Sequence, residues 1–112
     1  MGLMNCEIHG EIGVIPYVSK DLCQLILNKE KISPSKIKSI HVTFYDDGEI
    51  LFDRYYFFSI DLFNRLPLKE HYEIISDEDE SMFARLTQEH LGAVCVGCFK
   101  DYMNNIGYKY KL

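Results

Sequence analysis

Two short motifs near opposite ends of the chain carry side chains that bind transition metals. Cys6 and His9 form a C-x-x-H pair, and Cys95 and Cys98 form a C-x-x-C pair. A gap of two residues lets one tight turn direct both side chains at the same ion, and three sulfurs with one imidazole complete a tetrahedral set for zinc. We therefore predict one zinc ion bound by these four residues.

The predicted zinc ion is structural. A catalytic zinc keeps one coordination position for water, whereas four protein ligands fill every position here. Each motif also contains or adjoins a glycine, Gly10 after His9 and Gly97 inside the second pair. Glycine accepts the positive φ that such turns often need, and it lets backbone approach the sulfurs. A helix starting at Cys98 would offset the negative charge of the thiolates with its positive end.

Other interpretations of the cysteines are weaker. Cys95 and Cys98 could be buried as small hydrophobic side chains without a metal. A thioredoxin-like redox motif needs several elements after it, and too little chain follows Cys98 for them. Haem attachment needs a histidine after the second cysteine, where this chain has Phe99. Cys23 lies among leucines and isoleucines of a predicted helix, so we expect it in the core and not at the metal.

Composition limits the class of protein. The chain has 112 residues, 47% of them apolar, which fits one folded domain over residues 1–112. Its net charge of −5 argues against a broad grip on nucleic acid or on an anionic membrane. No apolar run approaches the about eighteen residues that would span a bilayer, and the start lacks a targeting pattern. We therefore expect a cytoplasmic protein with reduced thiols.

Hydrophobic patterning predicts an α+β fold with a small antiparallel sheet and three or four helices. The sheet is centred on a hairpin over residues 37–58, and knuckles at the two ends of the chain meet at the zinc ion. Serines followed by acidic residues mark helix starts, and Gly107 marks a helix end. The expected strands are 11–18, 37–45, 49–58, 72–75 and an edge strand at 108–111; the expected helices are 19–29, 60–66, 76–91 and 98–106.

The hairpin turns at Asp46-Asp47-Gly48, which fits a three-residue loop with a bulge. The predicted cross-strand pairs are Val42 with Phe52, Phe44 with Ile50, and His41 with Asp53. The His41–Asp53 pair resembles a catalytic pair, but an exposed ion pair is the simpler interpretation because the sequence has no candidate nucleophile near it.

Four consecutive aromatic residues, Tyr55 to Phe58, end the second strand of this hairpin. Successive side chains of a strand point to opposite faces, so two of them face the main core and two face the other side. The second pair is either covered by a helix or forms an exposed interaction patch, and we expect that a helix covers it.

The order of elements resembles a treble-clef zinc finger. In that family one ligand pair lies on a knuckle and the other at a helix start, as Cys6–Gly10 and Cys95–Tyr102 would here. The resemblance implies a zinc-bound fold, with residues 19–90 as a long insertion. The start C-x-x-H-G-E-x-G also resembles that of small bacterial proteins found among toxin–immunity systems. Some treble clefs are nucleases with paired histidines, a pattern that this chain lacks.

For function we therefore expect a non-catalytic, zinc-stabilised domain that binds another protein in an interaction, regulatory or immunity-like role. The acidic composition predicts a partner with a basic surface. Two alternatives remain open. One is a small enzyme that uses His41 and Asp53, and the other is a nucleic-acid-binding zinc finger, which the net negative charge disfavours.

Overall fold

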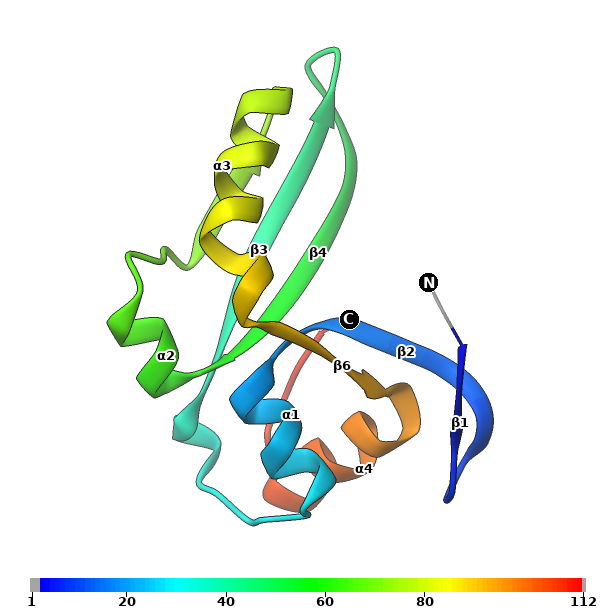
Figure 1. The fold of residues 1–112 in the computed structure, drawn as a ribbon. Coiled ribbons are helices and arrows are strands. Elements are labelled where there is room, and N and C mark those ends of the chain that lie inside the picture. The colour runs from blue at the N-terminus through cyan, green and yellow to red at the C-terminus, as the bar shows by residue number, and fades with distance from the viewer. Residues whose placement is uncertain (1–2, 112) are drawn as a thin grey trace.

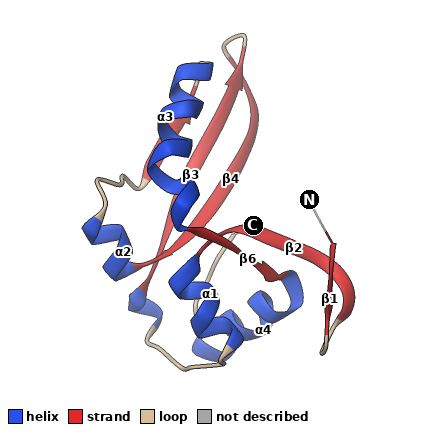
Figure 2. Cartoon of the chain, viewed as in Figure 1, coloured by secondary structure: helices blue, strands red, loops and turns tan. Residues whose placement is uncertain are grey.

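Four α-helices pack around a mixed six-stranded sheet in the computed structural model, which describes residues 3–111 (Figures 1 and 2). No helix in that part of the chain is long and apolar enough to cross a membrane. The strands are β1 (Leu3–Cys6), β2 (Gly10–Ser19), β3 (Ile37–Asp46), β4 (Glu49–Ser59), β5 (His71–Ile74) and β6 (Leu91–Cys95). The α-helices are α1 (Lys20–Leu27), α2 (Ile60–Arg65), α3 (Asp77–Thr87) and α4 (Val96–Ile106), with 3-10 turns at Pro34–Lys36 and Gln88–His90.

The sheet corrects the predicted antiparallel arrangement. Its order is β1-β2-β4-β3-β5, and β6 pairs with β2. The contacts β2–β4 and β3–β5 are parallel. The chain between the first pair contains α1, a loop and β3, and the chain between the second contains β4 and α2, so each connection is long enough for a crossover. The strand β6 was not expected. The sequence predicts a helix as far as residue 91 and then a knuckle, whereas α3 ends at Thr87 and a strand begins at Leu91.

The hairpin β3–β4 is present, but its register differs from the predicted one by two residues. Asp46 pairs with Glu49, so the loop is only Asp47-Gly48, with φ of 50° and 81°. Positive φ at both positions is typical of the two-residue type I′ turn, which matches the twist of the strands better than a three-residue loop. The predicted pairs become Val42 with Arg54, Phe44 with Phe52, and His41 with Tyr55. Between His41 and Phe44 this shift of two residues keeps the side chains on their predicted faces. The register changes again between Phe44 and Tyr45, so Ile50 pairs with Tyr45 and not with Phe44 as predicted.

Strand β4 divides the core into two clusters, one on each of its faces. Phe57 enters the first cluster together with α1 and α4, whereas Tyr56 and Phe58 enter the second with α2 and α3. Tyr55 packs against the first cluster at its margin. The aromatic run is therefore covered on both faces, as favoured from the sequence.

Polar residues at helix ends mostly act as predicted. The Ser59 hydroxyl accepts a hydrogen bond from the Leu62 amide at the start of α2, and Ser76 forms a capping box with Asp79 at the start of α3. Gly107 ends α4 with φ of +77°. The predicted strand at 108–111 is absent from the described tail; Tyr110 instead packs edge-on against Phe99, with ring centroids 5.1 Å apart.

Candidate metal centre

The first ligand pair lies on a tight hairpin between β1 and β2. Cys6 is the last residue of β1 and pairs with Gly10, the first residue of β2, so residues 7–9 form the turn. Gly10 has φ of +73°, a conformation that costs other residues a steric penalty. This turn holds the side chains of Cys6 and His9 on the same side, as the two-residue gap predicts.

The second pair lies where β6 continues into α4, which corrects the prediction of a second knuckle. Cys95 is the last residue of β6 and the N-cap of α4, and Cys98 lies in the first turn of that helix. Antiparallel pairing of Val14 with Cys95 joins β6 to β2. Because β2 also forms the first hairpin, this pairing brings the two motifs together in space although most of the chain separates them in sequence.

The four ligand atoms form a compact cage, all within 4.8 Å of one another. Nδ1 of His9 lies 3.5, 3.6 and 3.7 Å from the sulfurs of Cys6, Cys95 and Cys98, and the Cys6 and Cys98 sulfurs lie 3.6 Å apart. Tetrahedral zinc with ordinary bond lengths would separate its ligands by about 3.6 Å for N···S and about 3.8 Å for S···S. The residues present therefore fit a bound zinc ion.

The acid–base properties of the thiols also favour a cation at the centre. The hydrogen bond from His9 lowers the pKa of Cys6 from 9.0 to about 6, whereas burial raises the pKa of Cys98 to about 12. Three thiolates packed this closely would repel one another. A divalent ion removes the conflict, since coordination deprotonates each thiol and offsets its charge.

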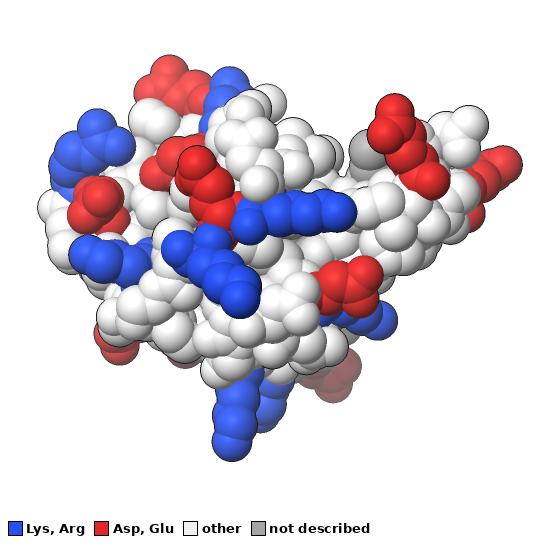
Figure 3. All heavy atoms as spheres, turned by 90° about the horizontal axis from the view of Figure 1, so that it is seen from below, with Lys and Arg blue, Asp and Glu red and all other residues white. Residues whose placement is uncertain are grey.

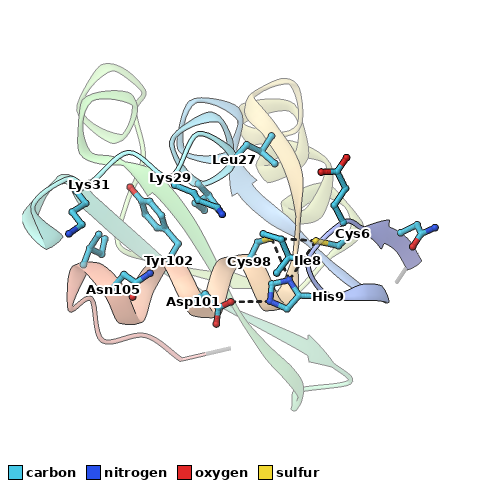
Figure 4. A pocket seen from close by; sticks show the side chains of 14 residues that line it. Cys6, Ile8, His9, Leu27, Lys29, Lys31, Cys98, Asp101, Tyr102 and Asn105 are labelled. Atoms are coloured by element: carbon cyan, nitrogen blue, oxygen red, sulfur yellow. Dashed lines mark hydrogen bonds and ion pairs between the residues drawn. The ribbon is translucent and has the colours of Figure 1, made fainter.

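Asp101 contacts the candidate ligand His9, a contact that was not predicted from the sequence. While Nδ1 of His9 faces the three sulfurs, Nε2 of the same ring lies 2.9 Å from Oδ2 of Asp101 on α4 (Figure 4). Contact with Cys6 and with this carboxylate raises the pKa of His9 above its ordinary value. A carboxylate behind a ligating imidazole fixes the tautomer and orients the ring toward the metal. The sequence does contain a signal for this role: Asp101 follows Cys98 by three residues, a spacing that places both on the same face of a helix.

Gly97 has a role in this centre that differs from the predicted one. It lies inside α4 with ordinary helical φ, so it does not provide a left-handed turn. A Cβ atom at this position would lie only 2.5 Å from Cδ2 of His9. The imidazole ring therefore lies directly on the helix backbone, a position that needs a residue without a side chain.

The first turn of α4 offers the thiolates a favourable field. It contains no acidic residue, and its N-cap Cys95 makes no side-chain capping hydrogen bond. Cys95 and Cys98 therefore place sulfurs where other helices place carboxylates or hydroxyls, near free amides and the positive end of the helix dipole. This agrees with the expectation that the helix start would offset the charge of the ligands.

A pocket of about 580 Å³ adjoins the ligand cage, between the first hairpin, α1 and α4 (Figure 4). The exposed side chains of Ile8 and Leu27 lie on its walls, and Lys29 and Lys31 line it near Tyr102. The Tyr102 hydroxyl donates to the Glu30 carbonyl at 2.5 Å and so ties α4 to the chain after α1.

The remaining candidate residues are not part of this centre. Cys23 is buried in α1, where its thiol contacts the Val18 carbonyl, and burial raises its pKa to about 11. His41 on β3 and Asp53 on β4 are brought within 3.5 Å, diagonally and not as directly opposed residues. Cys23 is therefore a core residue, as expected. His41 and Asp53 lie close to each other, but they do not belong to the thiol cage.

Comparisons with protein families, with curated proteins and with solved structures gave no match to this chain. The fold is α+β, and its Cys3His group could hold a metal ion such as zinc.

Proposed function

We propose that this protein is a non-catalytic interaction domain whose fold is held together by one structural zinc ion. The observation that carries the proposal is the cage itself: four potential ligand atoms lie within 4.8 Å of one another, and four protein ligands would leave a tetrahedral ion no position for a substrate or an activated water. A ligand pair on a hairpin and a second pair at a helix start is the arrangement of a treble-clef finger, which supports that finer assignment.

Metal content is the direct test of the zinc ion. Full-length protein purified without added metal should contain one zinc per chain by elemental analysis. Cys95→Ser should lose the metal and lower the melting temperature by more than about 10 °C, because the ion closes a very long loop. Cys23→Ala is the matched control, since it removes a buried thiol outside the cage, and it should keep the zinc. Full-length protein without metal would overturn the proposal.

A partner with a basic surface is supported by an uneven distribution of charge. The hairpin half, residues 37–90, has twelve acidic and five basic residues, a net charge of −7. The metal half, residues 3–36 and 91–111, has five acidic and seven basic residues, a net charge of +2. The formal charge of −5 therefore arises in the hairpin half, and electrostatic steering would direct a basic partner to it.

The hairpin tip is the strongest candidate for the contact itself. Ile50, Leu51 and Phe52 are 64%, 61% and 40% exposed, and we call these three residues the tip patch. The acidic residues Asp46, Asp47, Glu49 and Asp53 surround it in the sequence of the hairpin. An apolar centre with a charged rim is typical of protein-binding surfaces.

Binding assays can test this surface with matched variants. Leu51→Ser should reduce capture of a specific partner by immobilised protein, because it removes apolar area from the tip patch. Leu27→Ser is the control, since Leu27 is equally exposed at 59% but lies in the metal half. Binding should also weaken as salt is raised from low to physiological concentration. Identical capture by both variants would contradict the assignment of the tip patch.

Nucleic-acid binding remains the alternative for the metal half, where the lysines are concentrated. On the face seen from below α1 and α4, however, lysine side chains are interspersed with acidic ones (Figure 3). A continuous basic surface, which phosphate binding requires, is not formed on that face. A shift of labelled RNA or DNA by micromolar protein at physiological salt would favour this alternative over a protein partner.

A further inference from the structure

Two histidines outside the thiol cage are placed as a pair by the parallel contact between β3 and β5. His41 and His71 are direct partners in the register of these strands. Their Nδ1 atoms lie 3.1 Å apart, and their ring centroids lie 4.8 Å apart. The side chains are 33% and 46% exposed, whereas Nε2 of His41 is itself buried.

Each histidine of the pair has a carboxylate near its other ring nitrogen. Nε2 of His41 lies 3.5 Å from Asp53, and Nε2 of His71 lies 3.7 Å from Glu73. Within residues 3–111, neither carboxylate is within 4.0 Å of a lysine or arginine nitrogen. The group of four side chains therefore has two negative charges when both rings are neutral, and it attracts a cation.

The facing nitrogens have a geometry that a metal ion fits. With metal–nitrogen bonds of about 2.0–2.1 Å, a separation of 3.1 Å corresponds to an N–metal–N angle of about 100°. That angle lies between the square-planar and tetrahedral values that imidazole-bound copper, nickel and zinc adopt.

From this juxtaposition we propose that His41 and His71 form a second metal site, which binds one divalent transition ion through their Nδ1 atoms. Asp53 and Glu73 add negative charge beside the rings, although neither makes a hydrogen bond to a ring nitrogen and Nε2 of His41 is buried without such a partner among the described residues. The protein supplies only two ligands, so the remaining coordination positions are open to water or to a side chain of a bound partner. In this respect the site differs from the closed Cys3His cage.

Nickel is a suitable probe because it binds imidazole well. Full-length protein with its own metal in place is titrated with Ni²⁺ by calorimetry, and retained zinc is measured after each titration. One Ni²⁺ per chain should bind without loss of zinc. His41→Gln and His71→Gln should each abolish stoichiometric binding, while Asp53→Asn and Glu73→Gln should weaken it by a smaller factor, because they remove negative charge beside the rings.

His90 supplies the matched control. It also lies near a carboxylate, with Nε2 3.3 Å from Glu89, but within residues 3–111 no second histidine contacts it. His90→Gln should therefore leave Ni²⁺ binding unchanged. His71 is on a short edge strand and is the more exposed of the pair, so its variant stays informative if His41→Gln fails to fold, which circular dichroism would reveal.

A spectroscopic signature distinguishes this site from the thiol cage. Cu²⁺ bound by the pair should show electron paramagnetic resonance splitting from two nitrogen nuclei, reduced to one in either histidine variant. Absence of Ni²⁺ binding, or binding that persists in both variants, would overturn the proposal and leave the pair as a simple hydrogen bond between strands. Either result is independent of the zinc content that tests the proposed function.

Discussion

At the scale of single residues, His9 is the most constrained side chain of the candidate metal centre. Its Nδ1 contacts three sulfurs, its Nε2 contacts Asp101, and its ring lies on the backbone of Gly97. Each contact limits a different motion of the ring. Together they hold one ring nitrogen toward the three sulfurs, and such preorganisation reduces the entropy lost on coordination.

Replacement of Asp101 tests the orienting role of its carboxylate. Asp101→Asn should weaken zinc binding by about 10- to 100-fold, because the His9 ring loses the partner that fixes its tautomer. Competition with a coloured chelator measures the affinity. Asp46→Asn, a change of the same kind at the exposed end of β3, should have no effect. Equal affinity of the Asp101 variant and the parent would contradict this role.

Replacement of Gly97 tests the close approach of the ring. Gly97→Ala should destabilise the protein by about 1–3 kcal/mol and reduce its zinc content, since the added Cβ would lie 2.5 Å from the imidazole. Gly13→Ala is the control because its Cβ would meet only Val96, at an ordinary 3.8 Å. Thermal unfolding and elemental analysis give the two measurements, and a Gly97 variant with normal zinc content would show that the ring can move.

At the scale of elements, Asp21 joins the starts of α1 and α2. Its carboxylate accepts hydrogen bonds from the Ser19 hydroxyl at 2.6 Å, from the Leu22 amide at 2.8 Å, and from the Ser59 hydroxyl. Ser19 is the N-cap residue of α1, as the sequence predicts, but its hydroxyl makes no capping hydrogen bond. It donates to Asp21 and accepts from the Ser59 amide. The parallel contact of β2 with β4 brings these two strand ends together.

This network predicts a pH-dependent contribution to stability. Burial raises the pKa of Asp21, but the hydrogen bonds from Ser19, Ser59 and Leu22 together outweigh it, so the pKa lies below the ordinary 3.8. The ionised carboxylate therefore stabilises the fold fully above that ordinary value, and the contribution is lost as pH falls through the lower folded-state pKa. Asp21→Asn should cost about 1 kcal/mol near neutral pH.

Urea unfolding at about pH 6 and about pH 3 checks the direction of the Asp21 pKa shift. The difference between the parent and Asp21→Asn should shrink at the lower pH. Acid also displaces bound metal, but it does so in both proteins, so their difference isolates the carboxylate. Asp61→Asn, at the exposed first turn of α2, is the control and should show a smaller cost. A difference that grows in acid would mean that the pKa is raised and not lowered.

At the scale of the whole molecule, two clusters share one sheet but depend on different constraints. The first cluster joins α1, α4 and β6 to β2, and the candidate ligands at its edge are 86 residues apart between His9 and Cys95. The second cluster rests on the local hairpin β3–β4 with α2 and α3. Closing the long loop costs more chain entropy than closing the hairpin. The metal is therefore expected to matter most for the first cluster.

Hydrogen exchange during chelation should resolve the two clusters. Amides of β1, the first half of β2 and α4 should lose protection soon after the metal is removed, while those of β3 and β4 keep theirs longer. The same chelator saturated with zinc is the control and should leave exchange unchanged. Simultaneous loss of protection in both clusters would show that the molecule unfolds as one cooperative unit.

Much of this organisation was determined by the sequence alone. The ligand pairs, the caps at Ser59, Ser76 and Gly107, and the division of the aromatic run all depend on residues within four positions of one another. Local spacing imposes such features whatever the rest of the chain does. The two ligand pairs also had to meet if they were to bind one ion, which predicted the contact between distant ends of the chain.

Only the tertiary structure decided which strands lie side by side. The parallel contacts, the strand β6 and the two-residue shift of the hairpin depend on which faces find cover and on how tightly Asp47-Gly48 turns. The position of His71 opposite His41 follows from the same contacts. Pairings between distant strands are selected by burial summed over the whole chain, so no short stretch of residues contains enough information to specify them.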